Sequence, residues 1–384
     1  MLIAVIVVIH LFGTGANKKK AKAWINAHAP VLKKEFALVG FGGRSPTADE
    51  DESEGLAKSL ASDTLELPED LLKEKSPQEF TTYASGRQNV AFVDVNLSLL
   101  KRYSPLTMIA EWGMSMFFDS MPAPSERMEA ILYPFDGREA LTVPGQAPGA
   151  HELRKDTKSS YDGFVWAVVN KDTMKQLRDD RYDVSITSTK DSSKLPKWAT
   201  VMSESAEVTD FLLTPELIKA VEDAGELLEH LIITDQPIDQ PLKYAFFIVY
   251  VHRSLLTGIY RLDDTVPKKR LYLSMKVPSS GDYSKVLPLF QYFIRLTDTL
   301  VSGAHFRPEV MRKVRITRED MIKKLQKADE DDKAEERALD REKAKKVKRD
   351  NELKGLDAKA QKKYLEKEKE KEMRKAQKKQ TQKG

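Results

Sequence analysis

Residues 164–187 read FVWAVVNKDTMKQLRDDRYDVSIT, and their pattern sets the fold class. The apolar run Phe164–Val169 predicts a buried strand, the polar-faced segment Thr173–Arg181 a short helix, and Val184–Thr187 a second strand. Mixed strands and helices that lack a regular alternation of long strand–helix units indicate an α+β domain.

The same mixture continues on both sides of this stretch. The alternation of Val90–Leu99 predicts a half-buried strand, and Ile131 with Leu132 marks a short strand among the prolines of 122–148. Further predicted elements are a helical turn or two at 204–213, a helix from Thr214 to about Glu229, strands at 230–234, 242–251 and 270–277, and a helix at 282–302. Together these elements predict an α+β domain over residues 81–307.

The amino end is apolar, MLIAVIVVIHLF at 1–12, and is followed by a basic cluster, NKKKAK at 17–22. Twelve helical residues cover about 18 Å, whereas crossing a bilayer takes about 20 residues. Because positive charge behind an apolar run is typical of the cytosolic side of a span, we interpret 1–16 as the C-terminal part of a transmembrane helix whose beginning is missing. Residues 17–44, which follow, predict a basic juxtamembrane helix. The alternatives are a signal-peptide core and a buried first element of a soluble domain.

Two further segments stand out before the predicted domain closes. The acidic stretch SPTADEDESE belongs to a predicted solvated linker at 45–80. Residues 106–119, LTMIAEWGMSMFFD, are apolar on most faces and too short to span a bilayer, so they predict a helix in the core or against lipid or a hydrophobic partner. The candidate hydrophobic contact consists of Trp112, Met116, Phe117 and Phe118, with ordinary core packing as the alternative.

The carboxyl end predicts a long charged helix at 308–384, in the manner of a coiled-coil tail. Residues 321–384 carry 23 Lys/Arg against 15 Asp/Glu, and their apolar positions are too sparse for a self-sufficient two-stranded seam. Basic clusters on such a helix can neutralise RNA phosphates, a merely solvated helix or contact with lipid headgroups being the alternatives. The candidate ribosome or RNA contacts are Lys345, Lys346, Lys348, Arg349, Lys362, Lys363, Arg374, Lys375, Lys378 and Lys379.

No catalytic pattern accompanies these features. The chain has no cysteine, which excludes thiol nucleophiles, cysteine-ligated metals and disulfides. Phosphate-binding glycine loops, nucleophile elbows and zinc-protease pairs are absent from the sequence, and its histidines are never at metal-ligand spacing. We therefore expect a binding protein that is not an enzyme and has no metal or cofactor site.

Several segments in a fixed order resemble the calumin family, the coiled-coil-domain proteins of the endoplasmic reticulum membrane that belong to the PAT complex. These segments are AKAWINAHAPVLKKEFALVG at 21–40, YASGR at 83–87, SESAEVTDFLL at 203–213, KVPSSGDYSKVLPLFQYFI at 276–294 and the charged terminal helix. The resemblance covers most of the chain from Asn17 onward. It implies one transmembrane helix, a cytosolic α+β domain and a C-terminal coiled-coil helix.

The resemblance also implies a function and partners. Family members form an intramembrane chaperone with the small membrane protein Asterix at the ribosome-bound Sec translocon, where it shields nascent multi-spanning membrane proteins in the lipid bilayer. A basic tail that runs along ribosomal RNA or protein is then expected. The family's luminal acidic segment, and with it calcium binding, is not carried over, and 242–262 has no counterpart. The alternative is a soluble or membrane-tethered RNA- or ribosome-binding protein without a chaperone role.

Overall fold

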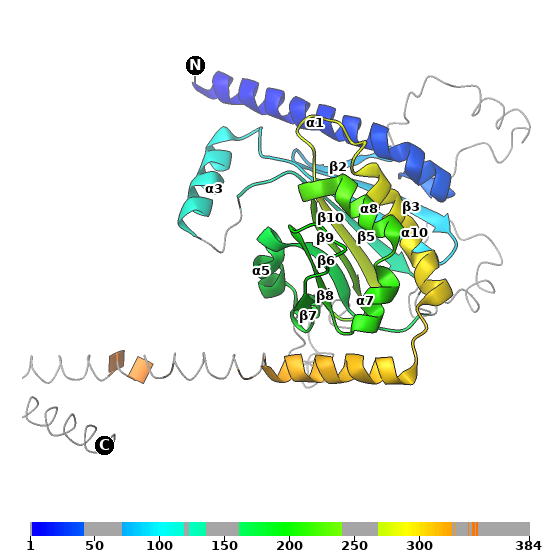
Figure 1. Ribbon diagram of the computed structural model, residues 1–384. Coiled ribbons are helices and arrows are strands. Elements are labelled where there is room, and N and C mark those ends of the chain that lie inside the picture. The colour runs from blue at the N-terminus through cyan, green and yellow to red at the C-terminus, as the bar shows by residue number, and fades with distance from the viewer. Residues whose placement is uncertain are drawn as a thin grey trace, which may run out of the picture. The chain divides into compact units, whose positions relative to one another are not determined.

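The computed structural model describes residues 2–41, 71–118, 123–135, 161–239 and 268–324, together with single residues between 327 and 344. Residues 1–321 form one compact unit and 322–384 a second. The first unit is built on an antiparallel sheet with ten described strands (Figure 1). This mixture of one large sheet and several helices is the α+β class that the sequence predicts.

The strands are β1 (Leu38–Val39), β2 (Lys73–Ser76), β3 (Glu79–Arg87), β4 (Val90–Ser98), β5 (Arg127–Pro134), β6 (Trp166–Asn170), β7 (Ser188–Lys190), β8 (Ala199–Ser203), β9 (Leu228–Thr234) and β10 (Arg270–Lys276). Their order in the sheet is β1-β3-β4-β5-β10-β9-β6-β8-β7, with β2 also paired to β3. The helices are α1 (Leu2–Glu35), α3 (Pro105–Phe117), α5 (Lys171–Asp180), α6 (Tyr182–Ser185), α7 (Ala206–Leu212), α8 (Pro215–Ala224), the 3-10 turn η2 (Gly225–Leu227), α10 (Leu287–Gly303) and a helix at 308–324.

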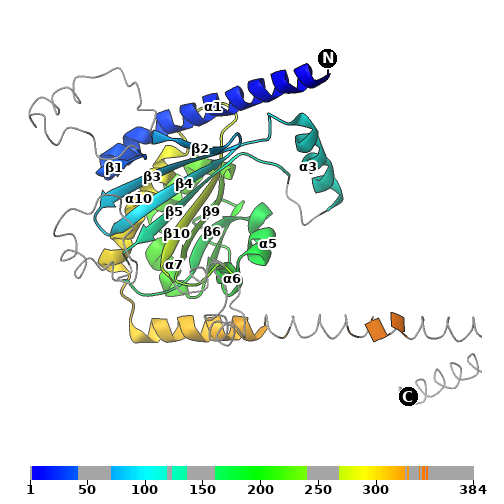
Figure 2. The ribbon, with the colours of Figure 1, turned by 180° about the vertical axis from the view of Figure 1, so that it is seen from behind.

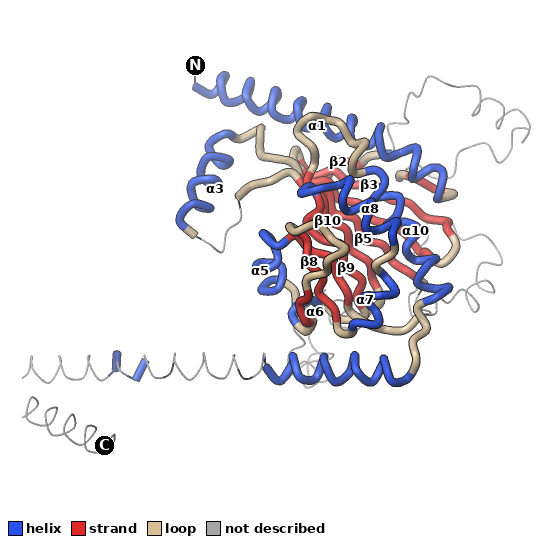
Figure 3. The backbone as a smooth tube through the Cα atoms, viewed as in Figure 1, coloured by secondary structure: helices blue, strands red, loops and turns tan. Residues whose placement is uncertain are grey.

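The core lies on both faces of the sheet, since successive strand residues point to opposite sides. In β6, Trp166 and Val168 belong to a large cluster with α1, α7, α8 and α10, whereas Ala167 and Val169 belong to a smaller cluster with α5 and α6. Every residue of β6 is buried, which explains its continuous apolar run. Figure 3 shows the strands between these two sets of helices.

Helix α1 runs without a break across the boundary expected between 1–16 and 17–44. Its second half packs onto the body through residues spaced three or four apart, among them Ala21, Trp24, His28 and Leu32. Its last residue, Glu35, accepts hydrogen bonds from Arg87 and Arg295. Among the described residues, no helix combines the length and the apolar character that crossing a bilayer requires.

Two local predictions are wrong. The strand expected at Val184–Thr187 is instead the helical turn α6, because Asp183 pairs with Arg181 at 2.7 Å and the Thr187 hydroxyl donates to the Val184 carbonyl. Both apolar side chains of the alternating pattern, Val184 and Ile186, are buried by this turn. The alternative interpretation of the segment 106–119 as a helix packed in the core is also wrong, since α3 has no buried residue.

Other predictions need new boundaries. The short strand at Ile131 and Leu132 is the eight-residue β5 at the centre of the sheet. The linker predicted at 45–80 falls mainly outside the described residues, but Leu71 is already buried and β2 follows it. The strand predicted at 242–251 lies outside the described residues.

Candidate membrane-facing site

One end of the first unit exposes large apolar side chains from α1 and α3, and we call these residues the apolar end. They are Val7, Val8, Ile9, Leu11 and Phe12 from α1, and Leu106, Ile109, Trp112, Met114, Met116, Phe117 and the adjoining Phe118 from α3. Phe12, Leu106 and Phe117 are 78%, 81% and 85% exposed. Figures 1 and 2 show α3 beside the N-terminal half of α1 from opposite sides. Large apolar side chains exposed together on two neighbouring helices mark contact with a membrane or a partner.

The segment leading into α3 holds the two helices together. The backbone of Arg102 and Tyr103 passes so close to Gly13 that a Cβ atom there would lie 2.4 Å from the Arg102 carbonyl carbon. The Tyr103 ring meets the His10 ring edge to face, with 5.5 Å between centroids. Gly13 is therefore the crossing point, where only a residue without a side chain allows this approach.

A partly buried polar network stabilises the same junction. The Asn17 side chain donates to the Pro77 and Leu100 carbonyls at 2.8 and 3.0 Å and accepts from Arg102 at 2.9 Å. Glu126, just before β5, accepts from Arg102 and Lys20. Burial alone would raise the pKa of Glu126, but the hydrogen bonds from Arg102 and Lys20 outweigh it and lower the pKa below its usual value. The carboxylate thus stays ionised and ties α1, the α3 leader and β5 together.

Positive charge follows directly behind the apolar part of α1. Lys18, Lys19 and Lys22 are exposed, and Glu35 at the end of α1 is the first acidic residue of the chain. An apolar surface bordered by lysines is suited to acyl chains on one side and phosphate headgroups on the other. No three His, Asp or Glu side chains among the described residues are grouped to hold a metal.

The four predicted contact residues, Trp112, Met116, Phe117 and Phe118, are all exposed at the apolar end. The structure adds the α1 residues and Leu106 and Ile109 to them. Residues 1–12 and 106–119 were each recognisable from sequence as apolar runs. Their meeting was not, because it depends on contacts between residues more than eighty positions apart, such as Asn17 with Leu100.

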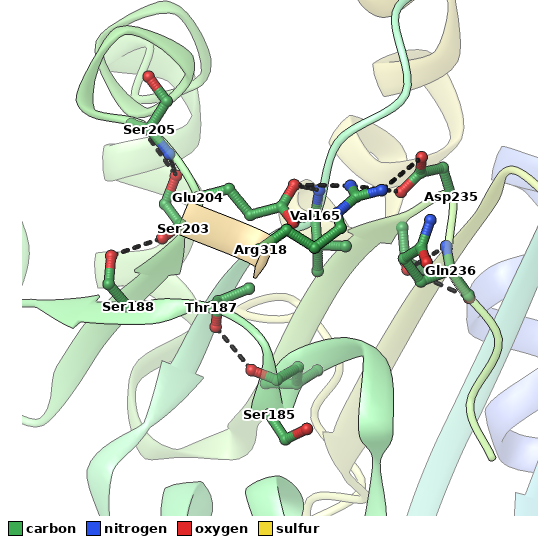
Figure 4. Close-up of polar contacts among 12 residues, drawn as sticks. Val165, Ser185, Thr187, Ser188, Ser203, Glu204, Ser205, Asp235, Gln236 and Arg318 are labelled. Atoms are coloured by element: carbon green, nitrogen blue, oxygen red, sulfur yellow. Dashed lines mark hydrogen bonds and ion pairs between the residues drawn. The ribbon is translucent and has the colours of Figure 1, made fainter. Parts of the chain in front are cut away.

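The base of the tail is anchored on the body by an arginine between two carboxylates (Figure 4). Arg318, in the helix 308–324, donates to Glu204 at 2.6 and 2.9 Å and to Asp235 at 3.1 Å. Glu204 has a fully buried side chain and also accepts from the Val165 amide at 2.8 Å. Burial raises the pKa of Glu204, and the bonds from Arg318 offset only part of this effect. The basic clusters predicted between Lys345 and Lys379 lie outside the described residues.

Comparison with known proteins gives the family. The family described as PAT complex subunit CCDC47 matches residues 1–375. A UPF0674 endoplasmic reticulum membrane protein of Schizosaccharomyces pombe is 28% identical over 94% of this chain and 80% of its own length. A UPF0674 endoplasmic reticulum membrane protein of Saccharomyces cerevisiae is 28% identical over 42% of this chain and 40% of its own. The human PAT complex subunit CCDC47 is 23% identical over 75% of this chain and 50% of its own length.

The chain thus spans about half the length of the CCDC47 proteins that it matches. The family is one of complex subunits and not of enzymes. A match over residues 1–375 includes the apolar end, the sheet and the base of the tail. The chain belongs to the CCDC47 family of PAT complex subunits.

Proposed function

We propose that this protein is a non-enzymatic subunit of a PAT-type complex, which acts at the endoplasmic reticulum membrane as an intramembrane chaperone for multi-spanning proteins. The apolar end carries the proposal, because a folded body with two exposed apolar helices beside a lysine band is suited to work at a bilayer surface. Membership of the family supports the assignment to this complex, and the names of the relatives support the assignment to the endoplasmic reticulum membrane.

The proposed topology follows from the order of apolar and basic residues in α1. The exposed side chains of residues 7–12 enter the bilayer as part of a single anchor, and Lys18, Lys19 and Lys22 remain at the headgroups. Since basic residues favour the cytosolic side, the sheet and its helices then lie in the cytosol. The alternatives of a signal-peptide core and a buried first element are less consistent with a helix whose second half is packed and whose residues 7–12 are exposed.

The proposed partners are an Asterix-type small membrane protein, the Sec translocon, the ribosome and nascent multi-spanning proteins. A polar side chain in lipid is energetically unfavourable until its hydrogen-bonding partner in the same protein has been synthesised. A transient partner that forms this hydrogen bond in the meantime prevents misassembly. Lys345, Lys346, Lys348, Arg349, Lys362, Lys363, Arg374, Lys375, Lys378 and Lys379 are proposed to contact ribosomal RNA or protein. Arg318 binds the first part of the predicted tail, residues 308–321, to the rest of the first unit.

Co-sedimentation with ribosome–translocon complexes tests the tail. The full chain, solubilised in mild detergent, is compared at low and high salt with two variants of the ten tail residues, one changed to glutamate and one with each lysine changed to arginine and each arginine to lysine. We expect the full chain and the charge-retaining variant to pellet at low salt, and charge reversal or added salt to release it. Pelleting that charge reversal leaves unchanged contradicts an electrostatic contact with the ribosome.

Site-specific photocrosslinking separates the chaperone from the second candidate function, an RNA- or ribosome-binding protein without clients. Stalled nascent chains of a multi-spanning protein, with the crosslinker in a membrane segment that carries a polar residue, should capture the protein. The same segment with the polar residue changed to leucine should capture less. Equal or absent capture from both segments, with ribosome binding intact, favours the second candidate.

A further inference from the structure

Helix α3 has the surface of a membrane-inserted helix although it sits on a folded body. None of its residues is buried, and Trp112 and Met116 are 56% and 69% exposed. Its single charged residue, Glu111, pairs with Lys101 just before the helix. The exposed surface of α3 is therefore almost entirely apolar.

The length of α3 excludes a transmembrane orientation. Its 13 residues cover about 20 Å, whereas the hydrocarbon core of a bilayer is about 30 Å thick. A short apolar helix that meets a membrane therefore lies in the boundary between headgroups and acyl chains, where a tryptophan is favoured.

The junction with α1 sets the depth at which α3 meets the membrane. The leader of α3 crosses α1 at Gly13, contacts His10 through Tyr103 and is bound by Asn17. These three α1 positions span the change from exposed apolar residues to the lysine band. When the N-terminal part of α1 is inserted into a leaflet, α3 therefore lies at the depth of the same leaflet.

We propose that α3 lies in the cytosolic leaflet as a second membrane contact, with the exposed lysines at 18, 19 and 22 beside it at anionic headgroups. The inference rests on the proposed membrane attachment of α1. Charge complementarity and continuity with the apolar part of α1 favour lipid over a second copy or another protein as the partner of α3. Membrane contacts through both α1 and α3 restrict the rotation of the body over the membrane. A single anchor through α1 leaves this rotation free.

The absence of cysteine permits a direct test on the full chain. Single cysteines that carry an environment-sensitive nitrobenzoxadiazole label are placed at α3 (Ile109→Cys and Met116→Cys), at α1 (Leu11→Cys) and at the matched exposed isoleucine of the helix 308–324 (Ile316→Cys). All four side chains are exposed, so the labels leave the core intact. The proteins are reconstituted into phosphatidylcholine vesicles with or without phosphatidylserine, and quenching by brominated acyl chains is compared with quenching by aqueous iodide.

We expect labels at 109, 116 and 11 to shift to shorter wavelength and to be quenched by brominated lipid, more strongly with phosphatidylserine, while the label at 316 stays accessible to iodide. If the label at 11 is in lipid but those at 109 and 116 are in water, the inference on α3 fails and the attachment of α1 stands. If the label at 11 is also in water, the proposed attachment itself fails. Labels at 109 and 116 that are protected from both quenchers show a protein partner and overturn the lipid assignment.

Discussion

Removal of the Arg318 side chain leaves a buried carboxylate without its cation. In Arg318→Met, the aliphatic stem is kept, but Glu204 loses two charge-assisted hydrogen bonds and keeps the one from the Val165 amide. Each such bond is worth about 1.5–3 kcal/mol, and breaking a buried ion pair from one side costs about 3–5 kcal/mol. Because the Glu204 side chain is fully buried, we expect the free energy of unfolding to fall by about 3–5 kcal/mol.

Urea unfolding in a non-denaturing detergent, followed by tryptophan emission, measures this loss, since Trp166 is fully buried and directly follows Val165, whose amide donates to Glu204. Arg315→Met is the matched control, because Arg315 is exposed on the same helix and should change stability by less than about 0.5 kcal/mol. The double variant Glu204→Gln with Arg318→Met should recover most of the loss, since the glutamine is neutral. Equal losses in the single and double variants refute the argument from an unpaired charge.

The loss in Arg318→Met should also depend on pH. Burial holds the pKa of Glu204 above its usual value in the folded state, and removal of the cation raises the pKa further. A raised carboxyl pKa means that the folded state gains stability as the pH falls and the group takes up a proton. The deficit of the variant should therefore shrink from pH 7 toward pH 5, and a deficit that grows in this direction contradicts the assignment.

Three further predictions concern α1 and its junction. Glu126→Gln should lower the free energy of unfolding by about 1–3 kcal/mol and speed amide hydrogen exchange in residues 100–117. Glu111→Gln, in an exposed pair, should lower the free energy of unfolding by less than about 1 kcal/mol. Equal effects of the two substitutions contradict the role of Glu126 in the junction. Gly13→Ala should displace the α3 leader at a cost of about 1–3 kcal/mol, while Gly15→Ala, with nothing within 4 Å of its Cβ, should gain up to about 1 kcal/mol in thermal unfolding. Burial lowers the pKa of His28 to about 4, so its contribution to stability is full above about pH 6.5 and falls by up to roughly 3 kcal/mol toward pH 4. His28→Gln should flatten urea-unfolding stability over this range, and an unchanged pH slope refutes the assignment.

Local periodicity predicted the elements whose apolar positions repeat regularly. Strands β4, β9 and β10 and helices α8 and α10 are all present near their predicted positions, but some of their ends differ. Helix α8 ends at Ala224 instead of about Glu229, β9 begins at Leu228 instead of 230, and α10 begins at Leu287 instead of 282. Strand β3 gave no such signal, because its sequence EFTTYASGR buries the polar residues Thr81, Thr82 and Ser85 together with Phe80 and Ala84, so that no regular apolar alternation results. The Thr82 hydroxyl donates to the Leu71 carbonyl at 2.7 Å, so this polar strand is stabilised by a partner that a local pattern does not reveal.

The candidate site was predictable in its parts but not in its arrangement. The apolar runs at 1–12 and 106–119 predict two helices. Hydropathy alone does not distinguish a buried helix from a helix that faces lipid. Their proximity depends on Gly13 and Asn17, single residues of α1 whose partners Leu100 and Arg102 lie more than eighty positions along the chain. Tertiary contacts of this kind are outside what sequence periodicity can report.

The closure of α1 on the body has a consequence for synthesis. Glu35 at the end of α1 bonds to Arg295 in α10, which is 260 residues later in the chain. At about 5–20 residues per second, a ribosome needs roughly 15–50 s to supply that partner. Throughout this interval the face of α1 that carries Trp24 and Leu32 has no α10 to cover it. The body is thus completed late in translation, after the apolar start of α1 has long been available to the membrane.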